Sequence, residues 1–267
     1  MYRAYWNMEY NPFEKEIDIN KLFRTKDFNE AQTRLEFLQQ TKGIGLFTGN
    51  PGSGKTYAIK YFLDHLNNGL HKVIYLPLTT VSVMDFYKAL AISLGLETCY
   101  SKTKMFFSIQ NHIRQMVQEQ KKNLIIAIDE VQLLQKDILT DLKILFNFEM
   151  DSKNMVTLIL IGLPVINHTL SKGIFEDLKQ RIVMKYDFNG ITEEDIRQYI
   201  TDRLKLVNSN PNIFNDKSII ALAGSCDGSI RKLNLIIERA LTIGALDKVN
   251  EIDSDIVMKA VNDISLT

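Results

Sequence analysis

Short apolar runs alternate along the first 190 residues with longer segments whose apolar residues recur every three or four positions. Short runs of this kind are typical of buried strands, and the longer spacing is typical of helices. The predicted strands are 43–48, 72–78, 123–128, 155–161 and 181–186, and the predicted helices are 29–40, 57–66, 84–94, 101–118 and 138–148. This alternation indicates an α/β fold with a central parallel sheet flanked by helices on both faces.

After Gly190 the hydrophobic pattern predicts helices only. Thr192 precedes three acidic residues, which is the pattern of a helix N-cap and first turn. The predicted helices are 192–206, 218–223, 230–246 and 254–264. We therefore expect an α/β domain of residues 1–190, which includes an N-terminal segment of residues 1–42, and a small all-helical domain of residues 191–267.

Residues 49–56 read Gly-Asn-Pro-Gly-Ser-Gly-Lys-Thr and lie between a predicted strand and a predicted helix. In that context G-x-x-x-x-G-K-T is the phosphate-binding P-loop, or Walker A motif, whose backbone N–H groups cradle phosphate oxygens. We expect Lys55 to reach the β- and γ-phosphates of ATP and the Thr56 hydroxyl to bind Mg²⁺. The remaining residues expected to contact the nucleotide are Asn50, Pro51, Gly52, Ser53 and Gly54.

Two carboxylates, Asp129 and Glu130, follow the apolar strand 123–128. Ligands of open parallel sheets bind at the carboxyl ends of the strands, and this arrangement is that of a Walker B motif. We expect Asp129 to hold the hydration shell of Mg²⁺. Glu130 would orient and deprotonate the attacking water, as a general base does. The alternative is a strand that ends in two solvated acids.

Composition adds limits rather than a function. The chain has 267 residues, of which 45% are hydrophobic, and 32 basic residues balance 32 acidic ones. Overall charge therefore indicates no polyanion partner, and any nucleic-acid surface has to be local. The sequence has no signal peptide and no apolar run of the roughly 18 residues that a membrane span requires, which predicts a cytoplasmic protein with no membrane partner. Cys99 and Cys226 lack metal-ligand spacing and are expected to be free thiols.

Several further stretches resemble the AAA+ ATPases, and within them the branch of ExeA-type ATPases and TnsC/TniB-type regulators of bacterial transposons. They keep the family order and cover nearly the whole chain. The stretches are 10–13 (Tyr-Asn-Pro-Phe), 129–134 (Asp-Glu-Val-Gln-Leu-Leu), 147–149, 160–164, 180–182, 199–204 and 228–234. The resemblance implies an AAA+ ATPase domain followed by a helical lid.

The resemblance also implies roles for two arginines. Arg181 matches an arginine finger that reaches the γ-phosphate bound by a neighbouring subunit, the alternative being a surface ion pair. Arg231 matches the sensor-2 arginine of the lid, the alternative being a solvated charge. The chain departs from the family at 161–163, where the fourth strand ends in Ile-Gly-Leu without a polar sensor-1 residue. Water positioning would then rely on Glu130 or Asn147, and hydrolysis is expected to be slow or partner-stimulated.

Two more surfaces are candidates for ligands. Pro12 and Phe13 precede the P-loop domain and would form an apolar wall against the nucleotide base, although Phe13 is as readily an ordinary core residue. In the transposon regulators that this chain resembles, loops between the P-loop and Walker B strands line a DNA channel. Hydroxyls and lysines there would contact phosphates without reading bases. These residues are Thr79, Thr80, Ser82, Lys102, Thr103 and Lys104, the alternative for the lysines being a solvated helix start.

The resemblance favours an ATP-dependent regulator of DNA transposition. Such a protein binds double-stranded DNA without sequence preference, assembles into a ring or helical filament, and recruits or activates a transposase or target-selection protein. ExeA-type secretion ATPases carry a membrane span and further domains, and we see neither in this sequence. An ExeA-like ATPase that acts on protein partners only is the alternative. A small-molecule kinase is a third class, disfavoured by Glu130 and by a lid with Arg231.

Overall fold

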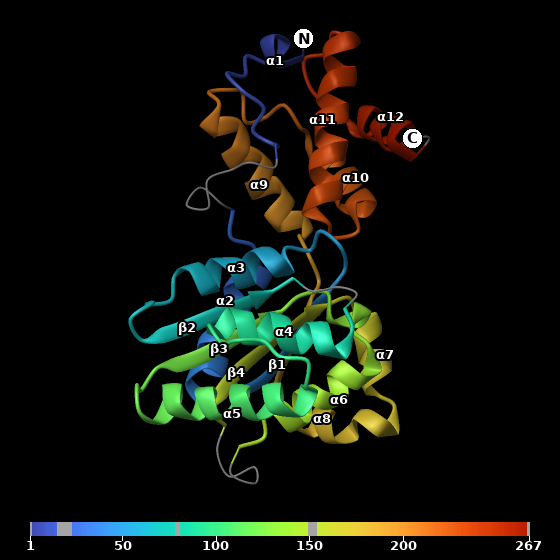
Figure 1. The fold of residues 1–267 in the computed structure, drawn as a ribbon. Coiled ribbons are helices and arrows are strands. Elements are labelled where there is room, and N and C mark those ends of the chain that lie inside the picture. Colours follow the sequence, from blue (N-terminus) through green and yellow to red (C-terminus); the bar gives the residue numbers. More distant parts are fainter. Residues whose placement is uncertain (1, 15–22, 78–80, 149–153, 266–267) are drawn as a thin grey trace. The chain divides into compact units, whose positions relative to one another are not determined.

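The computed structural model describes residues 2–14, 23–77, 81–148 and 154–265, which group into two compact units (Figure 1). The α/β unit comprises Glu30–Gly49 and Lys55–Phe188. The helical unit comprises Met1–Asn29, Asn50–Gly54 and Asn189–Thr267. The chain therefore passes from one unit to the other more than once, and the residues of the P-loop are divided between them.

A five-stranded parallel sheet forms the centre of the α/β unit, as the sequence predicts. The strand order is β2-β3-β4-β1-β5. The strands are β1 Gly43–Gly49, β2 His71–Leu76, β3 Asn123–Ile128, β4 Val156–Gly162 and β5 Ile182–Phe188. Every residue of β1 and β4 is buried, because the inner strands of a parallel sheet are covered on both faces.

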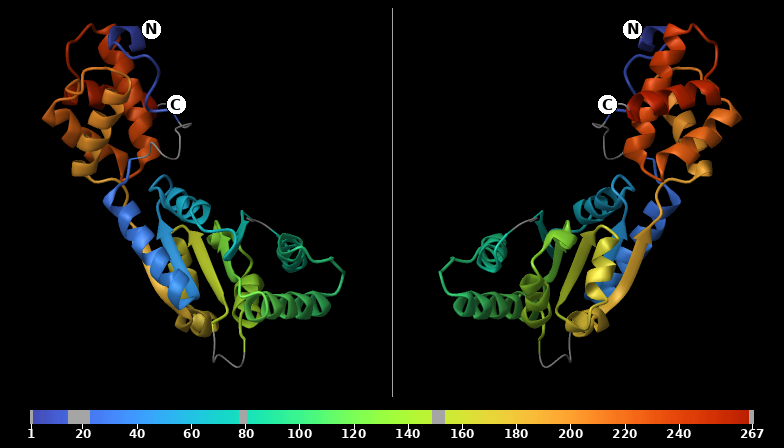
Figure 2. Two further views of the ribbon diagram at one scale, coloured as in Figure 1. Left: turned by 90° about the vertical axis from the view of Figure 1, so that its left-hand side faces the viewer. Right: turned by 90° about the vertical axis from the view of Figure 1, so that its right-hand side faces the viewer.

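Helices cover the two faces of this sheet. The helices of the α/β unit are α2 Lys26–Thr41, α3 Lys55–Asp64, α4 Val83–Leu94, α5 Lys102–Gln118, α6 Lys136–Leu145, α7 Val165–Leu170 and α8 Glu176–Gln180. The first turn of α2 clusters with the helical unit. Figure 2 shows α2 along one face and α4 and α5 on the other. A Cβ added at Gly45 would lie 2.4 Å from a Leu38 side-chain carbon, so β1 and α2 approach closely there.

The helical unit contains α1 Tyr2–Tyr5, α9 Glu193–Leu206, α10 Asp216–Cys226, α11 Ile230–Leu246 and α12 Ser254–Ser265. Thr192 is the N-cap of α9, as predicted, and forms a capping box with Asp195. None of the helices in the described ranges is both long and apolar enough to cross a bilayer. Cys226 is buried, and Cys99 is partly buried; both are free thiols.

The first part of the N-terminal segment, up to Asn29, groups with the helical unit, and the rest of residues 1–42 groups with the α/β unit. The sequence pattern had assigned all of residues 1–42 to the α/β domain. Trp6, Met8 and Phe13 belong to the same buried cluster as the apolar faces of α9, α10, α11 and α12. The indole N–H of Trp6 donates to the carbonyl of Leu241 at 2.8 Å. These apolar side chains complete a core that four helices alone leave open, and hydropathy along the chain gives no indication of which core receives them.

Candidate nucleotide site

Thr56 and Asp129 meet at the carboxyl edge of the sheet. Thr56 lies in the first turn of α3, which follows β1, and Asp129 directly follows β3. The Thr56 hydroxyl donates to Asp129 Oδ2 at 3.2 Å. Lys55, which precedes Thr56, is 6% exposed. The structure therefore brings together the hydroxyl and the carboxylate that the sequence predicts as Mg²⁺ ligands.

Asp129 is held by two further donors. Its Oδ1 accepts the backbone N–H of Glu130 at 2.8 Å, and its Oδ2 accepts the hydroxyl of Tyr75 at 2.6 Å. Burial, followed by the hydrogen bond and charge of Asp129, raises the pKa of Tyr75, so the phenol stays protonated and remains a donor. The motifs did not identify Tyr75. Tyr75 lies near the end of β2, beside Ala127 of β3, and is 41% exposed. In the sequence, the only sign of it is a tyrosine near the end of a predicted strand.

Glu130 has a left-handed backbone, with φ 52° and ψ 39°. Such a conformation costs a non-glycine residue about 1–3 kcal/mol and persists where the surroundings impose it. It begins a short 3₁₀ helix, η2 Val131–Leu133, and turns the chain away from the sheet. Within η2, Gln132 Nε2 donates to Glu130 Oε2 at 2.5 Å. The carboxylate predicted to be the general base is therefore fixed by a neighbour in its own turn.

Asn50–Gly54 of the P-loop pack within the helical unit against the start of α11. The N–H of Ile230 donates to the carbonyl of Gly52 at 3.0 Å. Gly52 has φ +82°, and a Cβ there would lie 2.1 Å from Ser229 Oγ and 3.2 Å from Arg231 Cβ. Only glycine combines this backbone with so close an approach. The predicted sensor-2 arginine, Arg231, thus lies beside the P-loop within this unit.

Taken by itself, each set of residues has the chemistry that one part of an ATP–Mg²⁺ complex requires. In the loop, Gly52 and Gly54 both have positive φ, and Ser53 Oγ is buried with no hydrogen-bond partner among the described residues. In the α/β unit, Thr56 and Asp129 provide the oxygen ligands that Mg²⁺ prefers. No cluster of three or more His, Cys, Asp and Glu side chains within the described ranges could hold a metal ion. Mg²⁺ would therefore need phosphate and water oxygens as ligands in addition to Thr56 and Asp129.

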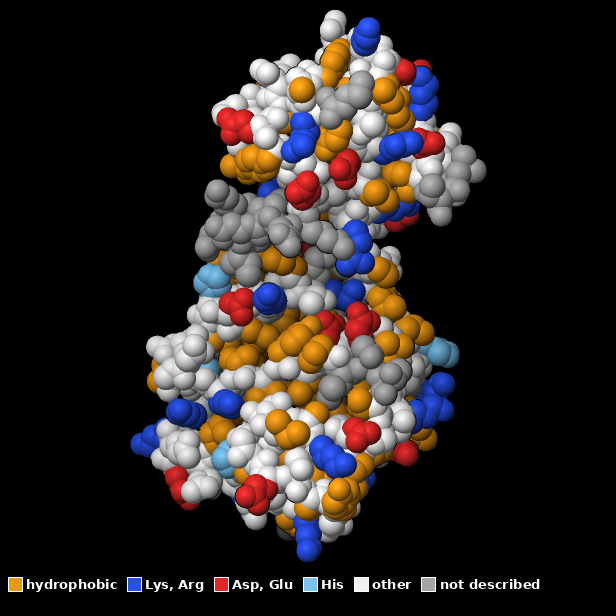
Figure 3. Space-filling view, turned by 45° about the horizontal axis from the view of Figure 1, so that its top comes forward, with side chains coloured by type: hydrophobic (Ala, Val, Ile, Leu, Met, Phe, Trp, Pro, Cys, Tyr) orange, Lys and Arg blue, Asp and Glu red, His pale blue; other side chains and the backbone are white. Residues whose placement is uncertain are grey.

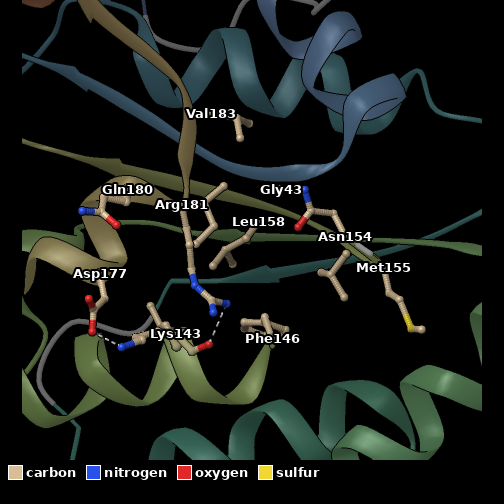
Figure 4. Close-up of a pocket in the computed structure, with 13 residues that line it drawn as sticks. Gly43, Lys143, Phe146, Asn154, Met155, Leu158, Asp177, Gln180, Arg181 and Val183 are labelled. Carbon is tan, nitrogen blue, oxygen red and sulfur yellow. Dashed lines mark hydrogen bonds and ion pairs between the residues drawn. The ribbon is translucent and has the colours of Figure 1, made fainter. Parts of the chain in front are cut away.

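Arg181 lies at the opposite edge of the sheet. It ends α8 and precedes β5, so it stands among the amino ends of the strands. Its side chain lines a pocket of about 470 Å³ together with Gly43, Met155 and Asn154 (Figure 4). Arg181 Nη1 donates to the carbonyl of Lys143 at 3.2 Å. Arg181 is thus far from Thr56 and Asp129 of its own chain, and a contact with phosphate would need a second chain.

Lys143 and Asp177 form an ion pair beside Arg181. The hydrogen bond and charge of Lys143 hold the pKa of the Asp177 carboxyl below its usual value. Asn147, two residues after the end of α6, is next to Phe146, which lines the same pocket. Asn147 therefore lies at the amino edge and does not stand beside Glu130, because α6 runs from one edge of the sheet to the other.

Phe13 and Pro12 are buried in the helical unit. Phe13 is 4% exposed and its ring lies 6.1 Å from the ring of Tyr199. Its carbonyl accepts from Asn234 Nδ2 at 3.1 Å. This environment matches the ordinary-core alternative for Phe13, and a contact with the nucleotide base stays a proposal.

The predicted DNA-contacting residues have different surroundings. Thr79 and Thr80 lie outside the described residues. Ser82 caps α4, accepting from the N–H of Asp85 at 3.2 Å. Lys102 pairs with Asp141 at 2.6 Å, whereas Thr103 and Lys104 are exposed in the first turn of α5. On the face in Figure 3, basic side chains are scattered with acidic ones among them. Lys102 and Lys104 are both exposed, and the charge of Lys102 is already paired with Asp141.

Comparison with known proteins gives relatives over nearly the whole chain. The family model described as an AAA domain matches residues 38–170. General secretion pathway protein A of Aeromonas hydrophila is 28% identical over 246 residues, which cover 90% of this chain and 44% of that protein. This chain thus spans less than half the length of that relative. The ATP-dependent target DNA activator B of Escherichia phage Mu is 22% identical over 98% of this chain and 79% of the phage protein.

Solved structures share the fold at low sequence identity. The ORC2 protein of Aeropyrum pernix superimposes with a TM-score of 0.63 and 14% identity, over 95% of this chain and 71% of that one. The RuvB Holliday junction branch migration motor of Thermotoga maritima gives a TM-score of 0.56 and 16% identity, over 92% and 73%. At such identities the likeness establishes the architecture and leaves the activity to the site residues.

Proposed function

We propose that this chain is an ATPase that uses ATP to switch its action on protein partners. The match of residues 38–170 to an AAA domain and the likeness of the fold to solved AAA+ structures support the proposal. One observation carries the proposal. The Thr56 hydroxyl and the Asp129 carboxylate, 3.2 Å apart, lie at the carboxyl edge of the sheet, and Glu130 follows Asp129 directly. This edge is where parallel sheets bind ligands. A phosphate-binding loop, two Mg²⁺ ligands and a carboxylate base are the parts that water-dependent phosphoryl transfer requires.

The chemistry divides among five residues. Lys55 neutralises charge on the β- and γ-phosphates, and Thr56 with Asp129 holds Mg²⁺, which when bound screens the phosphate charge. Glu130 orients a water towards the γ-phosphorus and accepts its proton as the water oxygen bonds to phosphorus and the bond from the γ-phosphorus to the bridging oxygen of ADP breaks. Arg231, beside Gly52, is proposed to contact phosphate from the same chain. ADP and phosphate leave, and the loss of the γ-phosphate is the signal that changes the interaction with the partner.

The comparisons favour protein partners over DNA, which reverses the order suggested by the sequence. The secretion pathway protein is 28% identical to this chain, and the phage target DNA activators are 22% identical. A switch in the assembly or secretion of proteins is therefore the main proposal. The proposed cellular compartment is the cytoplasm, where ATP is available to such an enzyme.

DNA target activation is the second candidate, favoured by a specific observation. The phage activators align with 98% of this chain and over 79% of their own length, whereas the secretion protein aligns over 44% of its own length. This candidate adds ATP-dependent assembly on double-stranded DNA and recruitment of a transposase. Its phosphate contacts would come from Ser82 and from the exposed Thr103 and Lys104.

Nucleotide binding and turnover of Lys55→Ala and Glu130→Gln test the main proposal. Lys55→Ala is expected to lose tight ATP binding because it removes the phosphate-reaching cation. Glu130→Gln is expected to bind ATP normally and to lose at least about a hundredfold in turnover, because an amide takes no proton. Parent-like turnover of Glu130→Gln would contradict the assignment of the base.

Turnover with and without duplex DNA separates the two candidates. DNA stimulation of ATPase activity that falls with salt favours the second candidate, through counterion release. In that case Lys104→Ala should weaken DNA binding with an ATP analogue. The matched control is Lys121→Ala, a lysine between α5 and β3. DNA-independent turnover, together with equal DNA affinity of Lys104→Ala and the parent, leaves the protein-partner switch as the function.

A further inference from the structure

The carboxyl end of β4 reads Ile-Gly-Leu at residues 161–163 and has no polar side chain, and a glutamine of η2 lies against it. Gln132 extends from η2 towards the residue that follows β4. The backbone N–H of Leu163 donates to Gln132 Oε1 at 3.0 Å. The other end of the same amide, Nε2, donates to Glu130 Oε2 at 2.5 Å. One side chain therefore connects the end of β4 with the carboxylate of Glu130.

The orientation of the Gln132 amide is determined by its two neighbours. Leu163 offers only a backbone donor, and the ionised carboxylate of Glu130 offers only acceptors. Reversing the amide would place donor against donor and acceptor against acceptor. Gln132 is partly buried, and among the described residues nothing else hydrogen-bonds the Glu130 carboxylate. The position of that carboxylate therefore depends on this one amide.

Gly162 makes the space that Gln132 occupies. A Cβ added at Gly162 would lie 2.6 Å from Gln132 Oε1 and 2.9 Å from Val131 Cγ2. The first distance is shorter than any van der Waals contact allows, so a side chain at residue 162 would displace the amide. The absence of a side chain at Gly162 and the position of Gln132 are therefore linked. Glycine at the strand end leaves room for a glutamine from the neighbouring turn.

We propose that Gln132 is the positioning residue of the general base, linking the end of β4 to Glu130. The inference rests on the proposed function, because it assumes that Glu130 accepts the proton of the attacking water. Gln132 occupies one carboxylate oxygen and leaves the other to accept from water. With the backbone of Glu130 fixed in the left-handed region, the remaining freedom of the base lies in its side-chain torsions, and Gln132 limits these.

Turnover and nucleotide affinity of two Gln132 variants test the proposal. Gln132→Met keeps the length and volume of the side chain and removes both hydrogen bonds. Gln132→Glu keeps an acceptor for Leu163 and replaces the donor by a second carboxylate that repels Glu130. Both variants are expected to lose roughly 10- to 100-fold in kcat, as misplacement of a catalytic group does, with an unchanged dissociation constant for an ATP analogue. Gln135→Met, an exposed glutamine just before α6, is the matched control and should turn over like the parent.

A double-variant cycle separates positioning from a general structural effect. Gly162→Ala should lower kcat by a similar factor, because its methyl group displaces the Gln132 amide. In Gln132→Met with Gly162→Ala the losses should not multiply, since both changes break the same link. Multiplying losses, or weaker ATP binding in step with kcat, would indicate separate structural damage and overturn the inference.

The Glu130→Gln variant distinguishes failure of this inference from failure of the proposed function. If Glu130→Gln is inactive and Gln132→Met turns over like the parent, Glu130 is the base and Gln132 does not position it. If Gln132→Met turns over faster than the parent, the amide restrains the base instead, and the inference is also overturned. If Glu130→Gln itself turns over like the parent, the proposed function fails first.

Discussion

Asp129 accepts three hydrogen bonds on its two oxygens, from the hydroxyls of Thr56 and Tyr75 and from the N–H of Glu130. At 5% exposure such a carboxylate requires donors, because burial without them is costly. Tyr75 is the donor with the shortest contact, 2.6 Å. In metal sites, partners of this kind orient the ligand and contribute to the affinity for the metal.

Tyr75→Phe is therefore expected to weaken the response to Mg²⁺. The ring keeps its packing, and Asp129 loses the hydroxyl that orients it. The Mg²⁺ concentration that half-saturates nucleotide binding should rise about tenfold or more, the scale of such changes in other metal sites. Titration of Mg²⁺ against binding of a fluorescent ATP analogue measures this. Tyr100→Phe, at a tyrosine that is 92% exposed, is the control, and equal half-saturation in Tyr75→Phe and the control would contradict the role.

The sequence identified the site residues that belong to motifs and missed those whose roles depend on contacts between strands. The sequence identified Thr56 and Asp129 because their motifs place both at the carboxyl edge, and the structure brings them together. Tyr75 and Gln132 were missed because their roles depend on which atoms face each other across β2, β3 and β4. Spacing along the chain contains no information on that register. The one indication in the sequence was the lack of a polar residue at 161–163.

At the scale of elements, α2 and β2 are joined by a histidine. His71, the first residue of β2, is 8% exposed, and its Nε2 lies 3.1 Å from Nε2 of Gln39 on α2. The Gln39 amide donates, so His71 accepts as a neutral imidazole. Burial lowers the pKa of His71. Protonation of His71 would place its Nε2–H against the N–H of the Gln39 amide, so that two donors face each other.

Stability should therefore fall as pH falls below the unfolded pKa of about 6.5. The folded pKa is lower, so between the two values the unfolded state binds more protons and the free energy of unfolding decreases with falling pH. Thermal unfolding of the parent at pH 7.5 and 5.5 measures the loss, about 1.4 kcal/mol for each pH unit between the two pKa values. His71→Gln should lose less between these pH values, whereas His65→Gln, at an exposed histidine, should match the parent. An equal loss in all three proteins would contradict this role.

The long elements of the fold were predictable, and the short ones were not. The helix predicted at 230–246 is observed as Ile230–Leu246, and all five predicted strands are present. The helices α7 and α8, of six and five residues, were missed between Leu163 and Arg181. A helix of fewer than two turns shows too few apolar positions for its period to be recognised.

At the scale of the whole molecule, the sheet has two chemically different edges. Thr56 and Asp129 lie at the carboxyl edge, and Arg181 at the amino edge. If Arg181 completes a phosphate site, the carboxyl edge of one chain has to face the amino edge of another. Such a contact joins unlike surfaces, and heterologous contacts of this kind produce rings or helical filaments rather than closed dimers.

Arg181→Ala is expected to reduce turnover and ATP-driven assembly together while the monomer stays folded. The change removes a guanidinium whose described hydrogen bond is to the carbonyl of Lys143, so the sheet keeps its own contacts. Size-exclusion chromatography with an ATP analogue measures assembly. Lys179→Ala, in the same helix, is the control. Unchanged assembly and normal turnover of Arg181→Ala would exclude the finger role.

The interleaving of the two units along the chain also governs how the protein can be taken apart. The polypeptide passes between units after residues 29, 49, 54 and 188. A cut at residue 190 would expose Trp6 and Met8 on one fragment and leave Gly52 without the N–H of Ile230. A fragment that begins at residue 190 therefore lacks part of the core of the helical unit. We expect that the unit cannot be expressed alone, or exchanged between homologues, by joining the coding sequence at one boundary. Any chimaera has to carry residues 1–29 and 50–54 together with residues 189–267.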